Sequence, residues 1–151
     1  MSAPPALNHL YLVHDEDNAA NLTPALDPHF APRRVALAFD PSRAALAEAM
    51  AGVLRGYGLR VDLWRLDDDH DAQGARARLA AHLDAAGAGE AGVGEAGAGA
   101  SWALNIAGGS RPVCAAAQML FRDRGLPIFY ADAQRDRVSW ISTPPPPNPP
   151  P

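Results

Sequence analysis

The chain has 151 residues, about one domain, and its 48% apolar and 20% charged residues are typical of a globular protein. A formal net charge of −4 argues against the broadly basic surface that binds duplex nucleic acid. One cysteine, Cys114, excludes a disulfide within this chain and any multi-cysteine zinc site.

Targeting signals are also missing from the sequence. The N-terminus has no basic segment followed by an apolar core, and no apolar run approaches the roughly 20 residues that span a membrane. We therefore expect a soluble, cytoplasmic protein with no membrane partner.

Strands and helices alternate along the first part of the chain. Apolar runs predict three buried strands, at residues 9–13, 35–39 and 59–66. Helices are expected between and after them, at 21–26, 41–57 and 72–86. Asp40 as N-cap and Pro41 at the first helical position mark the start of the second helix. Its periodicity predicts an inward face formed by Leu46, Met50, Val53, Leu54 and Tyr57.

The second part continues the alternation. After a strand at 102–104 we expect a helix at 110–124 and then two further strands, at 127–131 and 138–141. The gap between the last two strands is too short for a parallel crossover, so they should form an antiparallel hairpin. The whole pattern predicts an α/β fold: a Rossmann-like, doubly wound, mostly parallel sheet with a C-terminal antiparallel β-hairpin.

Two segments have biased composition. Residues 87–100 are almost entirely Gly, Ala and Glu, and we expect them to form a flexible loop within a single domain of residues 1–143. Residues 144–151 are rich in proline and are typical of a tail or linker.

The most informative segment is 105–111, Asn-Ile-Ala-Gly-Gly-Ser-Arg, which joins a strand to a helix. Adjacent glycines allow the backbone to approach a ligand, and the following helix start offers N–H groups and a positive dipole end. Ser110 adds a hydroxyl, and Arg111 adds a permanent charge. In the usual strand order, strands one and four are neighbours, so the loop after His14 and the turn after Asp40 would lie beside this anion site.

Other sites are less well supported by the sequence. The loop after the first strand contains no glycine, and no glycine-lysine-serine/threonine run exists, so neither a dinucleotide fingerprint nor a P-loop is present. The acidic run 67–71 suits a solvated helix cap better than a metal site, and we predict no metal centre. Ser110 is expected to be an N-cap or a phosphate donor, while Asn105 could bond the loop backbone or a ligand.

Taken together, residues 104–111, the run Gly-Leu-Pro-Ile-Phe-Tyr-Ala-Asp at 125–132 and Arg-Val-Ser-Trp at 137–140 resemble the CRISPR-associated Rossmann fold (CARF) family. The resemblance covers about residues 8–141. It is closest to the subgroup of cyclic-tetra-adenylate-activated nucleases of type III CRISPR systems, whose fourth strand ends in Asn-x-Thr-Gly-Gly-Thr-Lys. Here Ala107 replaces the threonine, and Ser110-Arg111 replaces the Thr-Lys pair.

The resemblance implies an antiviral sensor domain that binds a cyclic oligoadenylate second messenger, most simply cyclic tetra-adenylate, across a homodimer and needs no cofactor. A fused or separate nuclease effector would be its partner. The implied ligand contacts come from the first loop, the turn after the second strand and the glycine turn: His14, Asp15, Asn18, Asn21, Asp40, Asn105, Ala107, Gly108, Gly109, Ser110 and Arg111.

Two alternatives remain open at this point. One is a slow, metal-independent ring nuclease in which Ser110 and Arg111 would be the catalytic residues. The other is a dimerisation module without a small ligand. We expect a binding domain rather than an enzyme.

Overall fold

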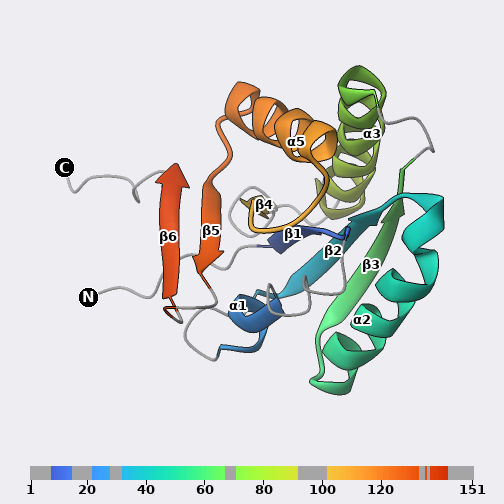
Figure 1. Ribbon diagram of the computed structural model, residues 1–151, viewed down its shortest axis with the longest axis vertical. Coiled ribbons are helices and arrows are strands. Elements are labelled where there is room, and N and C mark those ends of the chain that lie inside the picture. Colours follow the sequence, from blue (N-terminus) through green and yellow to red (C-terminus); the bar gives the residue numbers. More distant parts are fainter. Residues whose placement is uncertain are drawn as a thin grey trace.

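The structure is a computed structural model that describes residues 8–14, 22–27, 32–66, 71–91, 102–132, 135 and 137–142. Its centre is one six-stranded sheet with the strand order β3-β2-β1-β4-β5-β6 (Figure 1). The strands are β1 (Asn8–Leu12), β2 (Arg34–Phe39), β3 (Arg60–Arg65), β4 (Trp102–Asn105), β5 (Ile128–Asp132) and β6 (Arg137–Ser142). All neighbouring pairs are parallel except β5 and β6, which are antiparallel. The predicted fold class and C-terminal hairpin are confirmed.

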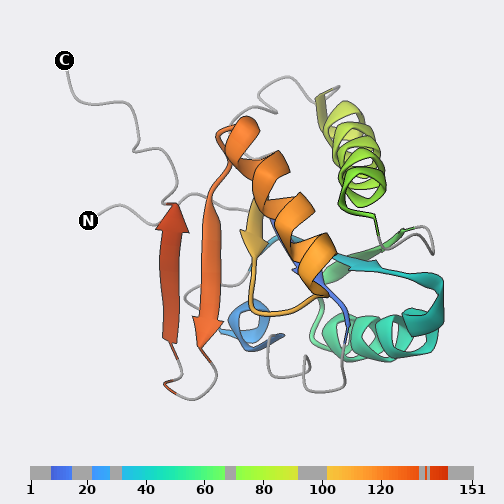
Figure 2. The same cartoon turned by 45° about the horizontal axis from the view of Figure 1, so that its top comes forward.

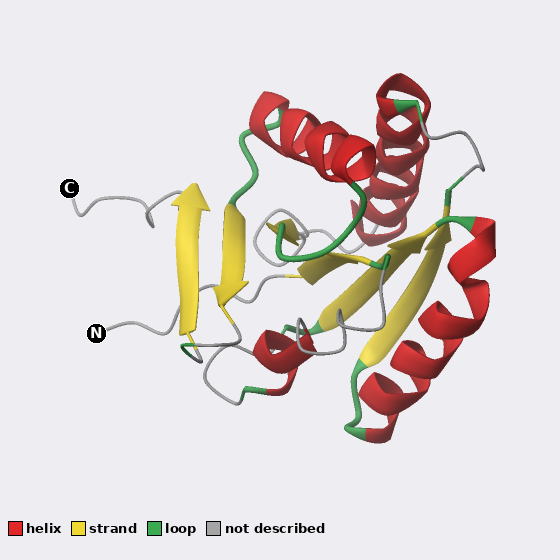
Figure 3. Cartoon of the chain, in the orientation of Figure 1, coloured by secondary structure: helices red, strands yellow, loops and turns green. Residues whose placement is uncertain are grey.

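Helices cover both faces of this sheet. The helical elements are α1 (Thr23–Leu26), a 3₁₀ turn η2 (Pro41–Arg43), α2 (Ala44–Gly56), α3 (Ala72–Ala91) and α5 (Arg111–Asp123). Figure 3 shows α3 and α5 side by side on one face, with α1 and α2 on the other. In the turned view of Figure 2, the β5–β6 hairpin forms one end of the sheet and α5 runs across β4 and β5. No helix of the described residues is long and apolar enough to cross a membrane.

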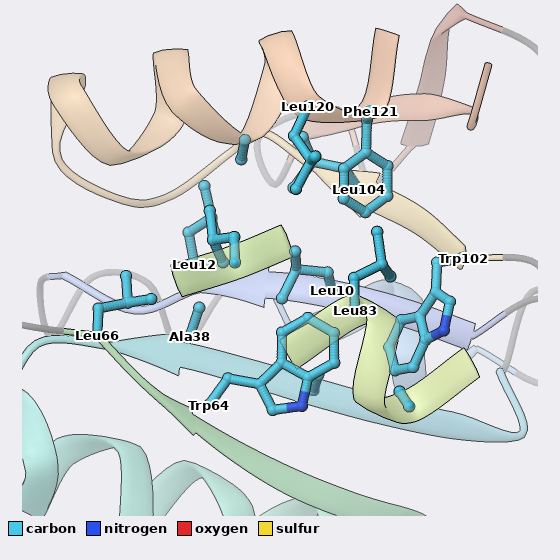
Figure 4. Close-up of a cluster of buried hydrophobic side chains, with 14 of the residues drawn as sticks. Leu10, Leu12, Ala38, Trp64, Leu66, Leu83, Trp102, Leu104, Leu120 and Phe121 are labelled. Atoms are coloured by element: carbon cyan, nitrogen blue, oxygen red, sulfur yellow. The ribbon is translucent and has the colours of Figure 1, made fainter. Parts of the chain in front are cut away.

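Successive side chains of the central strands point to opposite faces of the sheet, and a hydrophobic core lies on each face. On β1, Leu10 and Leu12 point to the α3/α5 face, whereas Tyr11 and Val13 point to the α1/α2 face. Figure 4 shows the first core, where Trp64, Trp102 and leucines of the sheet meet the inward side chains of α3 and α5. Because both faces of this segment are buried, apolar side chains follow one another from Leu10 to Val13 rather than alternating with polar ones.

One predicted helix face is wrong in part. Met50 and Leu54 of α2 are buried, but Val53 is 52% exposed and Tyr57 is 70% exposed. The buried stripe is centred on Ala47 and Ala51, whose small side chains allow α2 to lie close to the sheet. Periodicity shows that a stripe exists, but the bulk of the side chains does not show where its centre lies.

The predicted loop 87–100 begins too early. Helix α3 continues to Ala91, so residues 87–91 are helical, while residues 92–100 lie outside the described part. Alanine is the best helix former, and extending an existing helix avoids the cost of a new nucleus. The proline-rich segment 144–151 also lies outside the described residues.

A buried polar pair lies on the α1/α2 face of β1. The Nδ1 atom of His9 and the hydroxyl of Tyr11 are 3.1 Å apart and share a hydrogen bond. The His9 ring also lies 5.1 Å from the ring of Phe129. Burial lowers the pKa of His9 to about 3. Burial also raises the pKa of the Tyr11 phenol well above its usual value, opposed by a backbone hydrogen bond at Ala25. Both side chains are therefore neutral near pH 7.

This pair predicts an acid-sensitive fold. Because the folded-state pKa of His9 is below the unfolded value of about 6.5, the unfolded chain takes up one more proton as the pH falls toward 3. We expect the free energy of unfolding to drop by about 1.4 kcal/mol between pH 7.5 and 5.5 because of this group. Urea unfolding of His9→Gln should lack this drop, whereas His82→Gln should retain it. An equal pH dependence in the parent chain and His9→Gln would contradict the assignment.

Candidate anion site at the carboxyl edge of the sheet

The polar segments identified in the sequence meet at one edge of the sheet. Strand β1 lies between β2 and β4, with Leu12 paired to Ala38 and Tyr11 paired to Asn105. The three strands are parallel, so their carboxyl ends reach the same edge. The predicted adjacency of strands one and four is confirmed. This is the position at which open α/β sheets bind ligands.

Asn105 begins the turn that leaves β4. Its side chain is 1% exposed, and its Oδ1 accepts a hydrogen bond from the backbone N–H of Ala107 at 2.9 Å. The N–H of Ile106 donates to the carbonyl of Phe129 on β5 at 3.0 Å. These bonds attach Ile106 to β5 and fix Ala107 to the side chain of Asn105, so both residues that follow β4 are held in place. Of the two roles considered for Asn105, the structure shows the local one.

Gly109 brings this turn against β1. Its φ of +91° lies in the left-handed region, where glycine is favoured. A Cβ atom at this position would lie 2.8 Å from Cβ of Leu12 and 3.0 Å from its Cδ1. The turn therefore packs directly on Leu12, the last residue of β1. A residue larger than glycine at position 109 would displace either the turn or Leu12.

Ser110 and Arg111 follow at the start of α5. Ser110 is the N-cap residue in its backbone conformation, with φ −71° and ψ 161°, but its side chain makes no capping hydrogen bond. The predicted N-cap position is confirmed, and its hydroxyl has no partner among the described residues. Pro112 has no N–H, and the first turn contains no acidic residue. The positive end of the α5 dipole is thus uncompensated within the described chain.

Arg111 is a cation at the helix end where the dipole is positive. A cation in the first turn of a helix is disfavoured by the helix dipole, yet Arg111 is the first residue of α5 and is exposed. No ion pair of Arg111 with another described residue is present. Residues that violate a local preference mark functional positions, and a bound anion would offset this one. This strengthens the prediction of an anion site.

The β2 side of the edge contains a residue that sequence reasoning missed. Asp40 accepts hydrogen bonds from the backbone N–H of Ser42 at 2.9 Å and from its hydroxyl, which confirms the predicted cap. Arg43 donates from Nη1 to Oγ of Ser42 at 2.7 Å and from Nε to the carbonyl of His14 at 2.9 Å. Arg43 therefore links the turn after β2 to the end of the first-strand segment. The contact with His14 joins residues 29 apart in the sequence, so no local pattern indicated a role for Arg43.

The structure brings together only some of the predicted ligand residues. His14, Asp40 and residues 105–111 lie on segments that leave the same edge, whereas Asp15, Asn18 and Asn21 lie outside the described residues. Of the acidic run 67–71, only Asp71 is described, and its Oδ1 accepts from the N–H of Gln73 at 3.2 Å, as expected for a helix cap. The described residues contain no group of three or more His, Cys, Asp or Glu side chains that could hold a metal ion.

The contact at Gly109 gives a testable prediction with an internal control. Gly109→Ala should lower the free energy of unfolding by about 2 kcal/mol or more, because it adds both left-handed strain and a clash with Leu12. Gly58 has a similar φ of +88° and open space around it, so Gly58→Ala should show only the smaller backbone cost, about 1 kcal/mol. Urea unfolding measures both. Equal losses would mean that the turn does not pack on β1.

Known proteins share this arrangement at the level of the fold. No family model matches the chain, and no curated protein has a similar sequence. Among solved structures, protein VC1899 from Vibrio cholerae matches with a TM-score of 0.74 and 19% identity, over 89% of this chain and 33% of that one.

Two further similar structures are of proteins bound to, or activated by, a cyclic oligoadenylate. Can2 from Sulfobacillus thermosulfidooxidans, in complex with cyclic tetra-adenylate, has a TM-score of 0.68 and 18% identity, over 89% of this chain and 35% of that one. A type III CRISPR defence DNA nuclease activated by cyclic oligoadenylate has a TM-score of 0.60 and 20% identity, over 85% of this chain and 19% of that one.

These matches, each at 20% identity or less, confirm the resemblance drawn from the sequence at the level of the fold. The chain spans about a third or less of the length of each of these three structures. The six-stranded, mostly parallel sheet with its antiparallel β5–β6 hairpin is therefore a fold that this chain shares with these proteins.

Proposed function

We propose that this domain is a sensor that binds a cyclic oligoadenylate, with cyclic tetra-adenylate as the preferred ring, in type III CRISPR antiviral signalling. The observation that carries the proposal is the anion site at the start of α5. Its serine hydroxyl makes no cap, its helix dipole is uncompensated among the described residues, and its first residue is Arg111. That site lies at the carboxyl edge of a fold shared with Can2, which was solved with cyclic tetra-adenylate.

The chemistry of the site suits a phosphodiester. Backbone N–H groups near a helix start and an arginine fork both favour an anion with several oxygen acceptors. The proximity of Gly109 to Leu12 keeps side chains out of the turn, so a ligand backbone could approach the peptide groups closely. Neutral adenine rings would then lie over the loops after β1 and β2, where Asp40 and His14 are expected to contribute.

We further propose that two copies of the domain bind one ring. A ring of four equal units has an approximate two-fold axis, which matches the self-complementary interface of a homodimer. Each protomer would supply one glycine turn and one Arg111. Such a domain would control a nuclease effector, either fused to it or separate, by changing the relative position of the two protomers.

The charge of Arg111 provides the direct test. Arg111→Gln should weaken binding of cyclic tetra-adenylate about ten-fold or more, because a charge-assisted hydrogen bond contributes roughly 1.5–3 kcal/mol. Arg122→Gln is the matched control, since it removes the same charge from the last turn of the same helix. Isothermal titration calorimetry measures the affinities. The proposal fails if the parent chain binds no ring, or if both variants bind as the parent does.

A second candidate function, cleavage of the ring, is favoured by the uncapped hydroxyl of Ser110. In that case the hydroxyl would stabilise charge developing on the phosphate. Ser110→Ala should then lower the rate of ring opening at least ten-fold while changing the affinity by less than about three-fold. Chromatography of the ligand over several hours measures the rate. An intact ring after incubation with the parent chain would leave binding as the sole function.

A further inference from the structure

Arg43 has the features of a second ligand-binding residue, on the opposite side of β1 from Arg111. It is half-buried at the end of η2, immediately before α2. Its guanidinium is held at two points, by the carbonyl of His14 at 2.9 Å and by Oγ of Ser42 at 2.7 Å. Ser42 in turn donates its hydroxyl proton to Asp40. This chain of hydrogen bonds fixes the plane of the fork before any ligand arrives.

These contacts do not occupy all the N–H donors of the Arg43 guanidinium. A guanidinium carries five N–H donors, and Arg43 uses one on Nε and one on Nη1. The Nη2 atom has no acceptor among the described residues. Arg43 also makes no ion pair with another described residue, since its guanidinium is connected to the carboxylate of Asp40 only through the hydroxyl of Ser42. A pre-oriented cation with spare donors loses little entropy when it binds a planar or tetrahedral anion.

Arg43 and Arg111 follow different strands at the same edge of the sheet. Strands β2 and β4 flank β1, and adjacent strands are about 4.8 Å apart, so the carboxyl ends of β2 and β4 lie roughly 10 Å apart. Arg43 follows β2, and its hydrogen bond to the carbonyl of His14 holds its guanidinium at the end of the β1 segment, whereas Arg111 begins α5 after β4. Two cations that follow different strands at one edge suit a ligand with several separated phosphates better than one with a single phosphate.

We infer that Arg43 binds a second phosphate of the same ligand and so determines the preference for an oligoadenylate ring over a mononucleotide. This inference rests on the proposed function and deepens it. Asp40, which is predicted to contact the ligand, would also act as a positioning residue, because its carboxylate orients Ser42 and thereby the guanidinium.

The test compares variants of Arg43 with a matched arginine elsewhere on α2. Arg55 also donates to a backbone carbonyl, that of Val61 at 3.0 Å, but lies in the last turn of α2, next to the amino end of β3. We expect Arg43→Gln to weaken binding of cyclic tetra-adenylate about ten-fold and Arg55→Gln to leave it unchanged. Arg43→Lys keeps the charge and should lose less affinity than Arg43→Gln.

Salt dependence separates a charge contact from a structural effect. If Arg43 contacts a phosphate, the affinity of Arg43→Gln should fall less steeply between 50 and 300 mM NaCl than that of the parent chain, and Arg43→Lys should keep the parent slope. Unchanged affinity in Arg43→Gln, or a loss with the parent slope, would overturn the inference while leaving the sensor function intact. A parent chain that binds no ring would overturn both, and the two failures are thus distinguishable.

Discussion

The close contact between Gly109 and Leu12 is the constraint on which the site depends. The distance of 2.8 Å from a Cβ at Gly109 to Cβ of Leu12 leaves room only for a glycine, and the φ of +91° requires one. This contact sets the height of the turn above the end of β1, and hence the place where α5 begins. The buried Asn105 fixes the other end of the same turn through Ala107. Between these two anchors, the N–H groups of the turn and the start of the helix are presented at the edge of the sheet.

Helices starting at this edge depart from the usual charge pattern of helices. Neither α2 nor α5 has an acidic residue in its first turn, and arginines lie at the start of α5 and immediately before α2, although Asp40 caps η2. Arg111 is locally unfavourable beside the positive end of the α5 dipole, and Arg43 lies between the last turn of η2 and the start of α2. Elsewhere in the described chain, arginines form ion pairs, as between Arg34 and Asp62 or Arg124 and Asp84. A bound polyanion would offset the unfavourable interaction between Arg111 and the helix dipole. The local electrostatics therefore agree with the proposed binding of a cyclic oligoadenylate.

Much of the fold follows from the sequence, because apolar runs separated by helical segments leave few topologies once crossovers are right-handed. The adjacency of β1 and β4, and with it the position of the glycine turn, could be predicted for this reason. The centre of the buried stripe on α2 could not, since Ala47 and Ala51 rather than the larger Val53 and Tyr57 face the sheet. Arg43 was missed because its bond to His14 joins residues 29 apart in the sequence, and no local pattern reports such a contact. The start of α5 was recognisable because all its elements are contiguous in the chain.

We propose that the edge formed by β1, β2 and β4 binds one cyclic oligoadenylate between two copies of the chain. Native mass spectrometry of the domain mixed with cyclic tetra-adenylate would detect such a complex, with cyclic hexa-adenylate and linear tetra-adenylate as controls. We expect a species containing two protomers and one ring, formed in preference to complexes with the linear oligomer. Protomers that carry no ring, or a single protomer that binds linear and cyclic forms equally, would contradict it.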